Sequence, residues 1–554
     1  MTFWELFFRT LPYKPARALA AAYWHLTRRR MRARNRLRVA SSDLPFAYAV
    51  WIANNESLRD PTATAPKIIE SWTWRPGFTV MLHDVAGSST DAIERSSRSV
   101  AEQIYPFWQL VEDPVDPIGK ATAADGDYLV PLRIGDTLSK TALLRLADTL
   151  QLNRDVAILY GDHDELDQAG RRSRPWFKAR WNHEMFLAQD YVSAAVAIDM
   201  AVAREAAAAA KNVAELLIEA SWTDRPIVHV PHILCHVATA TEDQYRRLSA
   251  VSRKLQYLGA SCTEGPFGTI KVEWPLPSKL PLVTVIVPTK DKVDLLRPCV
   301  ESVLNKTDYE PFEILIVDNA SVEKRTAEYL ETVVSHPKVR LLPYPGTYNF
   351  SAINNAAARN ARGSYLCLLN NDTEVVSGEW LTELMRYAVR PDIGAAGAKL
   401  LYEDGTIQHA GVVVGIGEAA GHAHRFLPAH EPGYFRQPHV AQYVSAVTAA
   451  CLVVEKAKFE AVGGLDEAEL AVAFNDVDFC LKLEKAGWRN VYVPHAVLVH
   501  HESKSRGKDI SAANIDRYRR ELNVLQQRWG TKTYDDPLHN PNLDRYSETF
   551  VISL

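Results

Sequence analysis

The stretch that decides the fold is residues 282–288, which read LVTVIVP. It is short, rich in β-branched residues and without helical periodicity, which is typical of one buried strand. Apolar runs at 312–317 (FEILIV), 339–342 (VRLL) and 365–369 (YLCLL) follow, with helical patterns between them. Strands that alternate with helices predict an α/β domain with a parallel sheet.

Polar side chains follow three of these runs, at the point where each predicted strand ends. Thr289 and Asp291 follow the first run, Asp318 follows the second, and Asn370 and Asp372 follow the run at 365–369. Any one of them could be a turn or capping residue. Ligands of such sheets bind beyond the carboxyl ends of the strands, so three such ends together predict a binding site.

The C-terminal half resembles the family 2 glycosyltransferases, which have the GT-A fold of nucleotide-diphospho-sugar transferases. The similarity covers about residues 282–507, and its nearest form is the rhamnosyltransferase-like subset used in bacterial surface polysaccharide assembly. The segments that carry it are 285–289 (VIVPT), 314–321 (ILIVDNAS), 368–374 (LLNNDTE), 463–467 (GGLDE), 474–478 (FNDVD) and 500–503 (HHES).

The resemblance implies which residues hold the donor. Thr289, Asp291, Asp318 and Asn370 would bind the nucleotide, because carboxylates accept hydrogen bonds from pyrimidine N–H groups and ribose hydroxyls.

The same resemblance implies a divalent metal site. Residues 370–372 (NND) stand where the family carries its Asp-x-Asp motif, with Asn370 in place of the first acid. Asp372 would be the main ligand of Mn²⁺ or Mg²⁺, and His500 a second ligand. His501 is adjacent, so the sequence leaves the choice between the two histidines open.

Asp476 lies where the family places its catalytic base, at the start of a predicted helix. A helix-capping role is the alternative, since the helix dipole favours an acid at that position. As the base, Asp476 would take the proton of an acceptor hydroxyl in a single inverting displacement. Arg506 would stabilise the leaving diphosphate, and Asn355, Gln408, His409 and Arg506 are candidates for substrate binding.

The N-terminal half repeats the same plan in a degenerate form. Residues 126–132 (GDYLVPL) parallel residues 363–369 (GSYLCLL) at a constant offset of 237. Carried forward, this offset places Arg133 at the first position of the metal motif and Gly135 at the third. A guanidinium cannot ligate a metal, so we expect a second GT-A-like copy without catalytic activity.

Two further segments bear on this copy. Residues 211–217 (KNVAELL), where a base is expected, contain no Asp. An acidic run farther upstream leaves a separate metal site as the alternative interpretation; its candidate ligands are Asp162, His163, Asp164 and Asp167.

Composition and charge exclude several classes of protein. The 554 residues are 47% hydrophobic and 23% charged, which is ordinary for a globular protein and excludes wholesale disorder. With 63 basic and 67 acidic side chains, the net charge of −4 argues against general polyanion binding. Six scattered cysteines without a CxxC pair favour buried free thiols in a reducing compartment. The sequence predicts neither a transmembrane helix nor a secretory signal.

The first 40 residues differ from the rest of the chain. Between Leu6 and Ser42 there are ten Lys or Arg residues and no Asp or Glu, with aromatic residues interleaved. A solvated basic helix is one interpretation, and a membrane-surface anchor that attracts anionic lipid is another. Nucleic acid is the third choice, because nothing else in the chain resembles a module that reads it. We expect a cytoplasmic protein, peripheral on the inner face of the plasma membrane if the anchor is real.

We expect five segments along the chain. They are a basic and aromatic helical segment (1–60), the degenerate domain (61–264), a linker (265–281), the catalytic domain (282–530) and a C-terminal tail (531–554).

The predicted function is metal-dependent inverting sugar transfer. The donor would be UDP- or dTDP-linked, with rhamnose as the candidate sugar, and the acceptor a hydroxyl of a polysaccharide or lipid-linked oligosaccharide. The alternative is a non-catalytic scaffold or carbohydrate-binding partner in a polysaccharide assembly complex. No nucleic-acid partner is expected, and the oligomeric state is left open.

Overall fold

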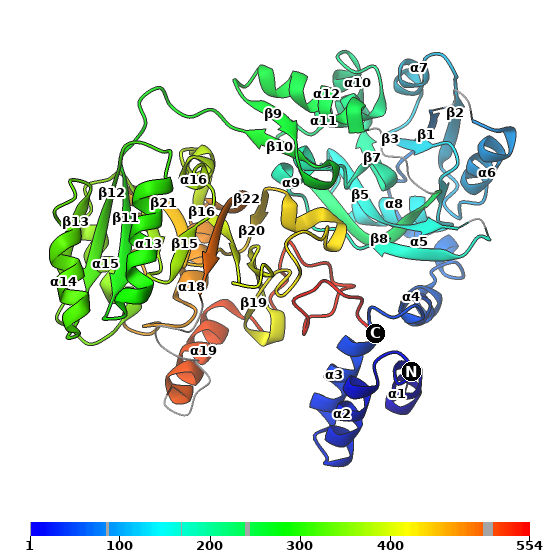
Figure 1. Ribbon diagram of the computed structural model, residues 1–554. Helices are drawn as coiled ribbons and strands as arrows, with labels where there is room; N and C mark the ends of the chain where they lie inside the picture. The colour runs from blue at the N-terminus through cyan, green and yellow to red at the C-terminus, as the bar shows by residue number, and fades with distance from the viewer. Residues whose placement is uncertain (1, 85–87, 168, 239–243, 502–513) are drawn as a thin grey trace. The chain divides into compact units, whose positions relative to one another are not determined.

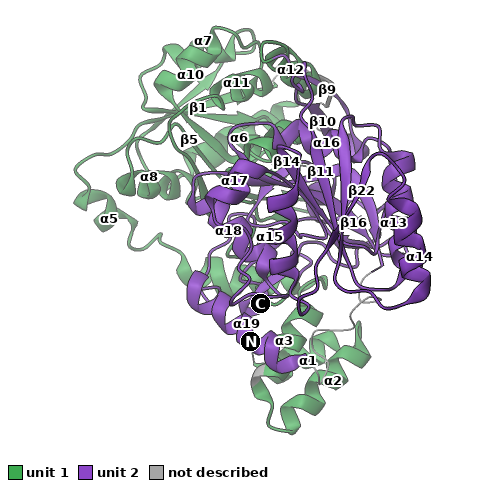
Figure 2. Cartoon of the chain, turned by 90° about the vertical axis from the view of Figure 1, so that its left-hand side faces the viewer, with its two compact units in different colours: residues 1–258, 539–547, 551–554 green, residues 259–538, 548–550 purple. Residues whose placement is uncertain are grey.

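The computed structural model describes residues 2–84, 88–167, 169–238, 244–501 and 514–554. It divides the chain into two compact units, shown in Figure 2. Unit 1 comprises residues 1–258, 539–547 and 551–554, and unit 2 comprises residues 259–538 and 548–550. Within the described ranges, no helix is long and apolar enough to cross a membrane.

Unit 2 is built on a mixed sheet. In spatial order its strands are β13 (Val339–Pro343), β12 (Phe312–Asp318), β11 (Val283–Thr289), β14 (Tyr365–Leu369), β21 (Cys451–Glu455), β16 (Ile393–Leu401), β22 (Arg489–His500) and β15 (Thr373–Val375). β17 (Ile407–His409) pairs with β16, and β20 (Gln442–Val444) pairs with β22. β11 is parallel to both β12 and β14, so the carboxyl ends of these three strands share one edge.

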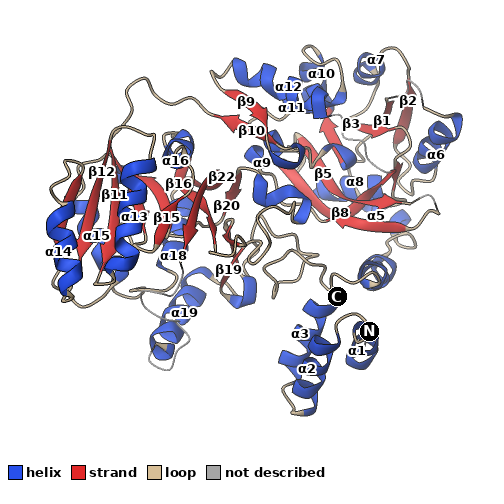
Figure 3. Cartoon of the chain, viewed as in Figure 1, coloured by secondary structure: helices blue, strands red, loops and turns tan. Residues whose placement is uncertain are grey.

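Helices cover this sheet (Figures 1 and 3). They are α13 (Val293–Lys306), α14 (Lys324–Val333), α15 (Phe350–Asn360), α16 (Trp380–Ala388), α17 (Lys456–Ala461), α18 (Asn475–Lys485) and α19 (Ile515–Trp529). α15 lies against β11 and β12, and α16 lies against β16, β21 and β22. The Asn349 side chain accepts the Ala352 N–H and starts α15, a cap that satisfies one of the free donors at a helix N-terminus. β18 (Val412–Val414) and β19 (Ala420–His422) form a separate hairpin.

Unit 1 contains a second mixed sheet. Its strands in spatial order are β2 (Trp108–Glu112), β1 (Phe78–His83), β3 (Tyr128–Arg133), β7 (Val196–Asp199), β5 (Ile158–Leu166), β8 (Ile227–Ala238) and β4 (Thr137–Leu138), with β6 (Arg172–Trp176) beside β5. Its helices are α1 (Phe3–Thr10), α2 (Pro15–Leu26), α3 (Arg30–Ser41), α4 (Ala47–Trp51), α5 (Ala65–Ser71), α6 (Thr90–Ala101), α7 (Pro117–Ala123), α8 (Ala142–Leu152), α9 (His183–Ala188), α10 (Met200–Ala207), α11 (Val213–Ala220) and α12 (Gln244–Gln256).

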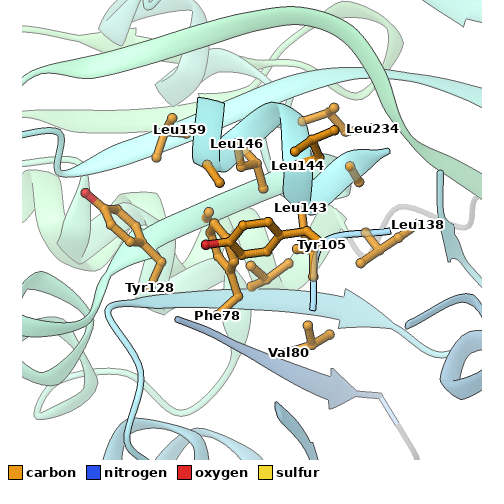
Figure 4. Close-up of a cluster of buried hydrophobic side chains, with 14 of the residues drawn as sticks. Phe78, Val80, Tyr105, Tyr128, Leu138, Leu143, Leu144, Leu146, Leu159 and Leu234 are labelled. Atoms are coloured by element: carbon orange, nitrogen blue, oxygen red, sulfur yellow. The ribbon is translucent and has the colours of Figure 1, made fainter. Parts of the chain in front are cut away.

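The core of unit 1 lies between its sheet and α8. Figure 4 shows Tyr105 beside Phe78, with Leu143, Leu144 and Leu146 of α8 over them. These leucines are almost fully buried, and each such side chain contributes about 1.5–3 kcal/mol of transfer free energy. The apolar face of α8 thus fixes that helix against the sheet, where it contacts β8.

The sheet of unit 1 repeats the sheet of unit 2 strand for strand. The order β2-β1-β3-β7-β5-β8-β4 corresponds to β12-β11-β14-β21-β16-β22-β15. Every matched pair of neighbours has the same orientation, parallel or antiparallel, in both sheets. Among the described residues, unit 1 has no counterpart of α14 or β13, and the Ala/Asn-rich α15 is matched by the shorter α7, which lies against β1 and β2 as α15 lies against β11 and β12. The prediction of two tandem α/β copies is confirmed.

Two segments of the structure differ from the sequence prediction. In place of a linker at 265–281, β9 (Ser261–Glu264) and β10 (Ile270–Glu273) form an antiparallel hairpin that belongs to unit 2. Ile270 and Val272 are buried, so alternating apolar residues there outweigh the prolines that follow. Residues 531–554 do not form one tail, because 539–547 and 551–554 are part of unit 1.

The cysteines behave as the sequence predicts. All six are free, and all but Cys262 are buried. Burial raises the pKa of the Cys299 thiol to about 12, so this thiol stays protonated at neutral pH.

Candidate functional site

A cleft of about 470 Å³ opens at the carboxyl ends of β11 and β14, next to the start of α18. Among the predicted site residues, Thr289, Asp291, Asn370, Asp372 and Asp476 line it. The strand ends and the helix start that carry them are far apart in the sequence, and the sheet brings them to one place.

Asp291 is held by the loop before α14. Its backbone is left-handed, with φ of 56°, and its Oδ1 accepts the N–H groups of Val322 (2.7 Å) and Glu323 (2.8 Å). Asp318 lies behind it and does not line the cleft. The Asp318 carboxylate accepts from the N–H (3.1 Å) and the hydroxyl (2.5 Å) of Ser321, whose Oγ accepts the Asp291 N–H (2.7 Å). Asp318 therefore supports Asp291 through Ser321.

Asp372 and His500 converge beside Asn370. His500 Nε2 lies 3.1 Å from Asp372 Oδ1 and 3.3 Å from Asn370 Nδ2. His500 is at the end of β22, and its neighbour Thr373 in β15 follows Asp372 directly, so strand pairing brings the two side chains together. On the far side of the ring, Nδ1 lies 2.6 Å from Gln408 Oε1.

These contacts fit a divalent cation. A carbonyl oxygen only accepts, so Gln408 Oε1 places the ring proton on Nδ1 and leaves the Nε2 lone pair facing the Asp372 carboxylate. Two lone-pair donors that face each other can both ligate one cation, which would also contact a phosphate of the donor. Mg²⁺ commonly takes only one or two protein carboxylates. In the described part of the chain there is no group of three or more His, Cys, Asp or Glu residues spaced to hold a metal ion.

His501 lies differently from its neighbour. Its Nδ1 faces Glu403, and its backbone N–H donates to the carbonyl of Asp372 (2.9 Å). Of the two histidines, the geometry therefore brings His500 to Asp372.

Asp476 is the second residue of α18, at a strained turn. Phe474 before it has φ of 62°, a left-handed conformation that is unusual for an aromatic residue. Asp476 Oδ2 accepts the Ala449 N–H (3.1 Å), and Oδ1 accepts the Val477 N–H (2.9 Å). Two backbone donors thus fix the carboxylate, and each of its oxygens keeps a free lone pair for a further donor.

The other candidates for substrate binding lie away from the cleft lining. Asn355 bonds to the backbone of Leu465 through both atoms of its amide (2.8 and 3.0 Å). His409 is fully buried and faces His422 (Nδ1 to Nδ1, 3.0 Å), and burial holds its pKa well below the usual value. Gln408 contacts His500. Arg506 lies outside the described residues.

Several residues of the cleft were missed by the sequence analysis. Lys290 and Lys292 flank Asp291, are exposed, and form no ion pair with any acid of the described ranges. Their position directly after Thr289 could have identified them. The other residues missed include Glu323, Tyr348, Phe350 and Thr448.

The matching positions of unit 1 lack both proposed ligands. The Leu138 N–H donates to Ser99 Oγ (3.1 Å) on α6, as the Val375 N–H donates to Ser302 Oγ (3.1 Å) on α13. The offset of 237 therefore holds through β4, and Gly135 stands at the position of Asp372, as the sequence predicts. The pairing of β4 with β8, compared with that of β15 with β22, places Val237 at the position of His500.

The side chains next to these positions are engaged within unit 1. Arg133, at the position of Asn370, donates through Nη2 to Asp136 Oδ1 (3.1 Å), and the Ala238 N–H donates to the same oxygen (2.9 Å). His236 Nδ1 faces Asp164 Oδ1 (2.5 Å). Unit 1 thus carries a guanidinium at the first position of the metal motif and no carboxylate at the third.

The acidic run of unit 1 is structural, which overturns the alternative of a metal site there. Asp162 is fully buried and accepts from the Lys178 N–H (2.8 Å) and from Asn540 Nδ2 (3.1 Å). Asp164, equally buried, accepts from Tyr48 Oη and Arg172 Nε (both 2.5 Å). The two acids thus tie the N-terminal and C-terminal segments of unit 1 to its sheet.

Residues 284–422 match the model of the family described as Glycosyl transferase family 2. The C-terminal half of this chain is a family 2 glycosyltransferase domain. Its strand order, with the cleft at the parallel carboxyl ends, is the GT-A arrangement that the sequence predicts.

Three relatives extend the similarity beyond this domain. The chain is 39% identical over 455 residues to the uncharacterized protein y4gI of Sinorhizobium fredii, covering 78% of this chain and 50% of the relative. It is 34% identical over 521 residues to the O-antigen biosynthesis protein RfbC of Myxococcus xanthus, covering 89% and 39%. It is 28% identical over 222 residues to an N-acetylglucosaminyl-diphospho-decaprenol L-rhamnosyltransferase of Mycobacterium tuberculosis, covering 36% and 69%. The chain spans half the length of the first relative and less of the second.

Proposed function

We propose that the transferase domain moves a sugar from a nucleotide-diphosphate donor to a hydroxyl of a growing polysaccharide or lipid-linked glycan. The observation that carries the proposal is the single cleft in which Asp372 and Asp476 meet Thr289 and Asp291. The relative named for O-antigen biosynthesis and the relative named as a rhamnosyltransferase support polysaccharide assembly and make rhamnose the first donor sugar to test.

The donor would lie across the carboxyl ends of β11 and β14. Thr289 and Asp291 would accept hydrogen bonds from the base and ribose. Lys290 and Lys292 stand beside them as unpaired cations at the edge of the cleft, and ammonium groups suit phosphate oxygens. This placement directs the diphosphate toward Asn370 and Asp372.

Asp372 and His500 would hold Mn²⁺ or Mg²⁺ against that diphosphate. When bound, the ion supplies positive charge to the leaving group. The role of the chain is to present one carboxylate oxygen and one imidazole lone pair, with Gln408 fixing the tautomer.

Asp476 would act as the base. Its carboxylate is fixed by two backbone N–H groups and borders the same cleft, so a free lone pair can take the proton of an acceptor hydroxyl. A hydroxyl activated opposite the leaving diphosphate attacks the anomeric carbon once, which inverts its configuration. General base catalysis of this kind contributes about 10²–10⁴-fold to a rate.

The proposal is tested by nucleoside diphosphate release from a panel of UDP-, dTDP- and GDP-sugars with Mn²⁺. We expect release from one donor. Asp476→Asn should lower transfer at least a hundredfold while donor affinity stays within about twofold, and Asp372→Ala should weaken both donor and Mn²⁺ binding. Asp136→Asn, which removes the carboxylate next to the matching position (Gly135) of unit 1, is the control and should leave transfer unchanged.

The outcome also decides between the two classes of function. Donor binding without release, equal in the wild type and Asp476→Asn, would instead support the non-catalytic carbohydrate-binding alternative. Undiminished turnover in Asp476→Asn would remove Asp476 from the role of base.

A further inference from the structure

The first three helices of unit 1 form a small group with its own core (Figure 1). α1, α2 and α3 contact one another, and their inward side chains make a cluster of Leu6, Phe7, Ala18, Ala21, Ala22 and Leu37. The group contains helices alone, as Figure 3 shows. The inward side chains alone therefore form the core of this group, and its outward side chains are not needed for that packing.

The outward side chains are unexpectedly apolar. Among the described residues, six of the twenty exposed large apolar side chains lie between Trp4 and Leu26. Phe8 is 64% exposed, and Leu26 is 71% exposed. A concentration of this kind marks a surface that binds something, whereas single exposed apolar residues are normal.

The spacing places these residues in two stripes. On α1, Trp4 and Phe8 are four residues apart; on α2, Leu19, Tyr23 and Leu26 follow at intervals of four and three. Residues at these spacings share one face of a helix. The Trp4 and His25 rings touch edge to face at 5.4 Å, so the two stripes meet where α1 begins and α2 ends.

A strong positive charge borders the stripes. Arg28, Arg30, Arg34 and Arg36 are exposed, and no acidic side chain of the described ranges pairs with them. Arg32 and Arg29 stack on the Trp24 ring, at 4.3 and 4.8 Å from its centre. Lys14 pairs with Asp43 at 2.5 Å and is the exception.

We propose that this surface, formed by the outward faces of α1 and α2 and the arginines of 28–36, docks on an anionic lipid bilayer. Aromatic and leucine side chains enter the headgroup and upper acyl region, while the arginines contact lipid phosphates. Leu19 and Leu26 are aliphatic and cannot stack on bases, which disfavours a nucleic acid. The helices lie on the membrane, since the longest of the three has 12 residues and none spans a bilayer.

This inference does not depend on transferase activity, although it fits a lipid-linked acceptor. Docking would hold the chain at the surface where such an acceptor is embedded. Its failure would leave the proposed reaction intact, and an inactive chain could still dock.

The test is co-sedimentation of the full chain with large unilamellar vesicles. One set contains phosphatidylcholine alone, and the other contains phosphatidylcholine with phosphatidylglycerol. We expect binding to the anionic set, at least tenfold weaker on the neutral set, and weaker again when salt is raised from 0.1 to 0.5 M.

Two variants separate the two contributions. Phe8→Ser with Leu19→Ser and Leu26→Ser removes the apolar stripes, and neutralising four arginines with Arg28→Gln, Arg30→Gln, Arg34→Gln and Arg36→Gln removes the charge. Each should lower binding at least tenfold. The matched control, Leu58→Ser with Leu152→Ser and Tyr257→Ser, changes three still more exposed apolar residues elsewhere in unit 1 and should bind like the wild type. Replacing the same four arginines by Lys should preserve binding.

Several results would overturn the proposal. One is the absence of wild-type binding to anionic vesicles at low salt. Another is binding of the stripe variant at the wild-type level. Tighter binding to a duplex or single-stranded oligonucleotide than to the vesicles would assign the surface to nucleic acid. A concentration-dependent dimer that the stripe variant abolishes would assign it to a second copy of the chain.

Discussion

One hydrogen bond decides which nitrogen of His500 faces Asp372. Gln408 Oε1, 2.6 Å from Nδ1, can only accept, so the Nε2 lone pair points to Asp372. Without this acceptor, the ring is free to carry its proton on Nε2 or to rotate away. Gln408 is therefore a positioning residue that acts through His500.

We predict that Gln408→Leu weakens Mn²⁺ binding about tenfold, because partners that orient a ligating histidine contribute about 10–100-fold to affinity. The measurement is an electron paramagnetic resonance titration of Mn²⁺ in the presence of the nucleoside diphosphate that the donor screen selects. Gln408→Glu keeps an acceptor oxygen and should retain the wild-type affinity. Equal affinities in both variants would show that Gln408 has no part in the site.

Single residues of the cleft could be predicted where their position follows from the alternation of strands and helices. Thr289, Asp291 and Asp372 follow apolar runs, and the end of a parallel strand is where ligands bind. The partner of His500 could not be predicted in this way, because Gln408 lies 92 residues away and reaches it through the pairing of β17 with β16. The sequence placed Gln408 among substrate-binding residues, whereas its Oε1 faces a histidine.

At the scale of elements, α19 holds the turn that carries Asp476 from both sides. The buried Glu521 accepts the N–H groups of Val472 (3.1 Å) and Ala473 (2.9 Å), just before the strained Phe474. Seven residues later on the same helix, Arg528 Nη1 donates to the fully buried Asp478 (2.8 Å), just after Asp476. Asp476, the proposed base, is thus fixed by contacts three and four residues before it and two residues after it.

We predict that Glu521→Gln lowers kcat about tenfold or more and leaves donor affinity within twofold. An amide can accept only through one oxygen, so one of the two backbone N–H groups loses its partner and the turn shifts. Displacements of about 1 Å near a reacting group cost up to a hundredfold in rate. Steady-state transfer and a separate donor titration measure the two quantities.

The control for this prediction is Arg519→Gln, an exposed residue on the same helix. It should leave kcat unchanged. A parallel loss of kcat and of donor affinity in Glu521→Gln, with a lowered melting temperature, would indicate general destabilisation of α19 rather than positioning of Asp476.

The same scale shows where prediction from sequence fails for elements. The strands β11, β12 and β14 could be predicted from their long apolar runs, because both faces of a central parallel strand are buried. The hairpin of β9 and β10 was hidden, since its strands have four residues each and stand beside Pro266, Pro275 and Pro277. The two strands pair with each other, and tertiary contacts that bury their apolar side chains outweigh the turn signals of the nearby prolines.

At the scale of the whole molecule, the two sheets share one strand order, and the cleft that gathers Asp372 and Asp476 lies in unit 2. The duplication was detectable from the matching segments at an offset of 237, and the backbone hydrogen bonds of Asp136 and Leu138 keep this offset through β4. Only strand pairing shows that Val237 stands at the position of His500. Unit 1 therefore lacks both proposed ligands and carries the guanidinium of Arg133 in addition.

We predict that the chain binds one Mn²⁺, and that the ion lies in unit 2. In unit 1, Gly135 stands at the position of Asp372 and Val237 at that of His500, and Arg133 pairs with the adjacent Asp136 at 3.1 Å. A positive charge there repels a cation directly. Titration of Mn²⁺ with nucleoside diphosphate should give a stoichiometry near one, and Asp372→Ala should abolish it. Arg133→Asn should leave the stoichiometry at one, because Gly135 and Val237 supply no ligand. Two ions on the wild type, or one retained in Asp372→Ala, would place a metal in unit 1 and contradict the absence of ligands at its matching positions.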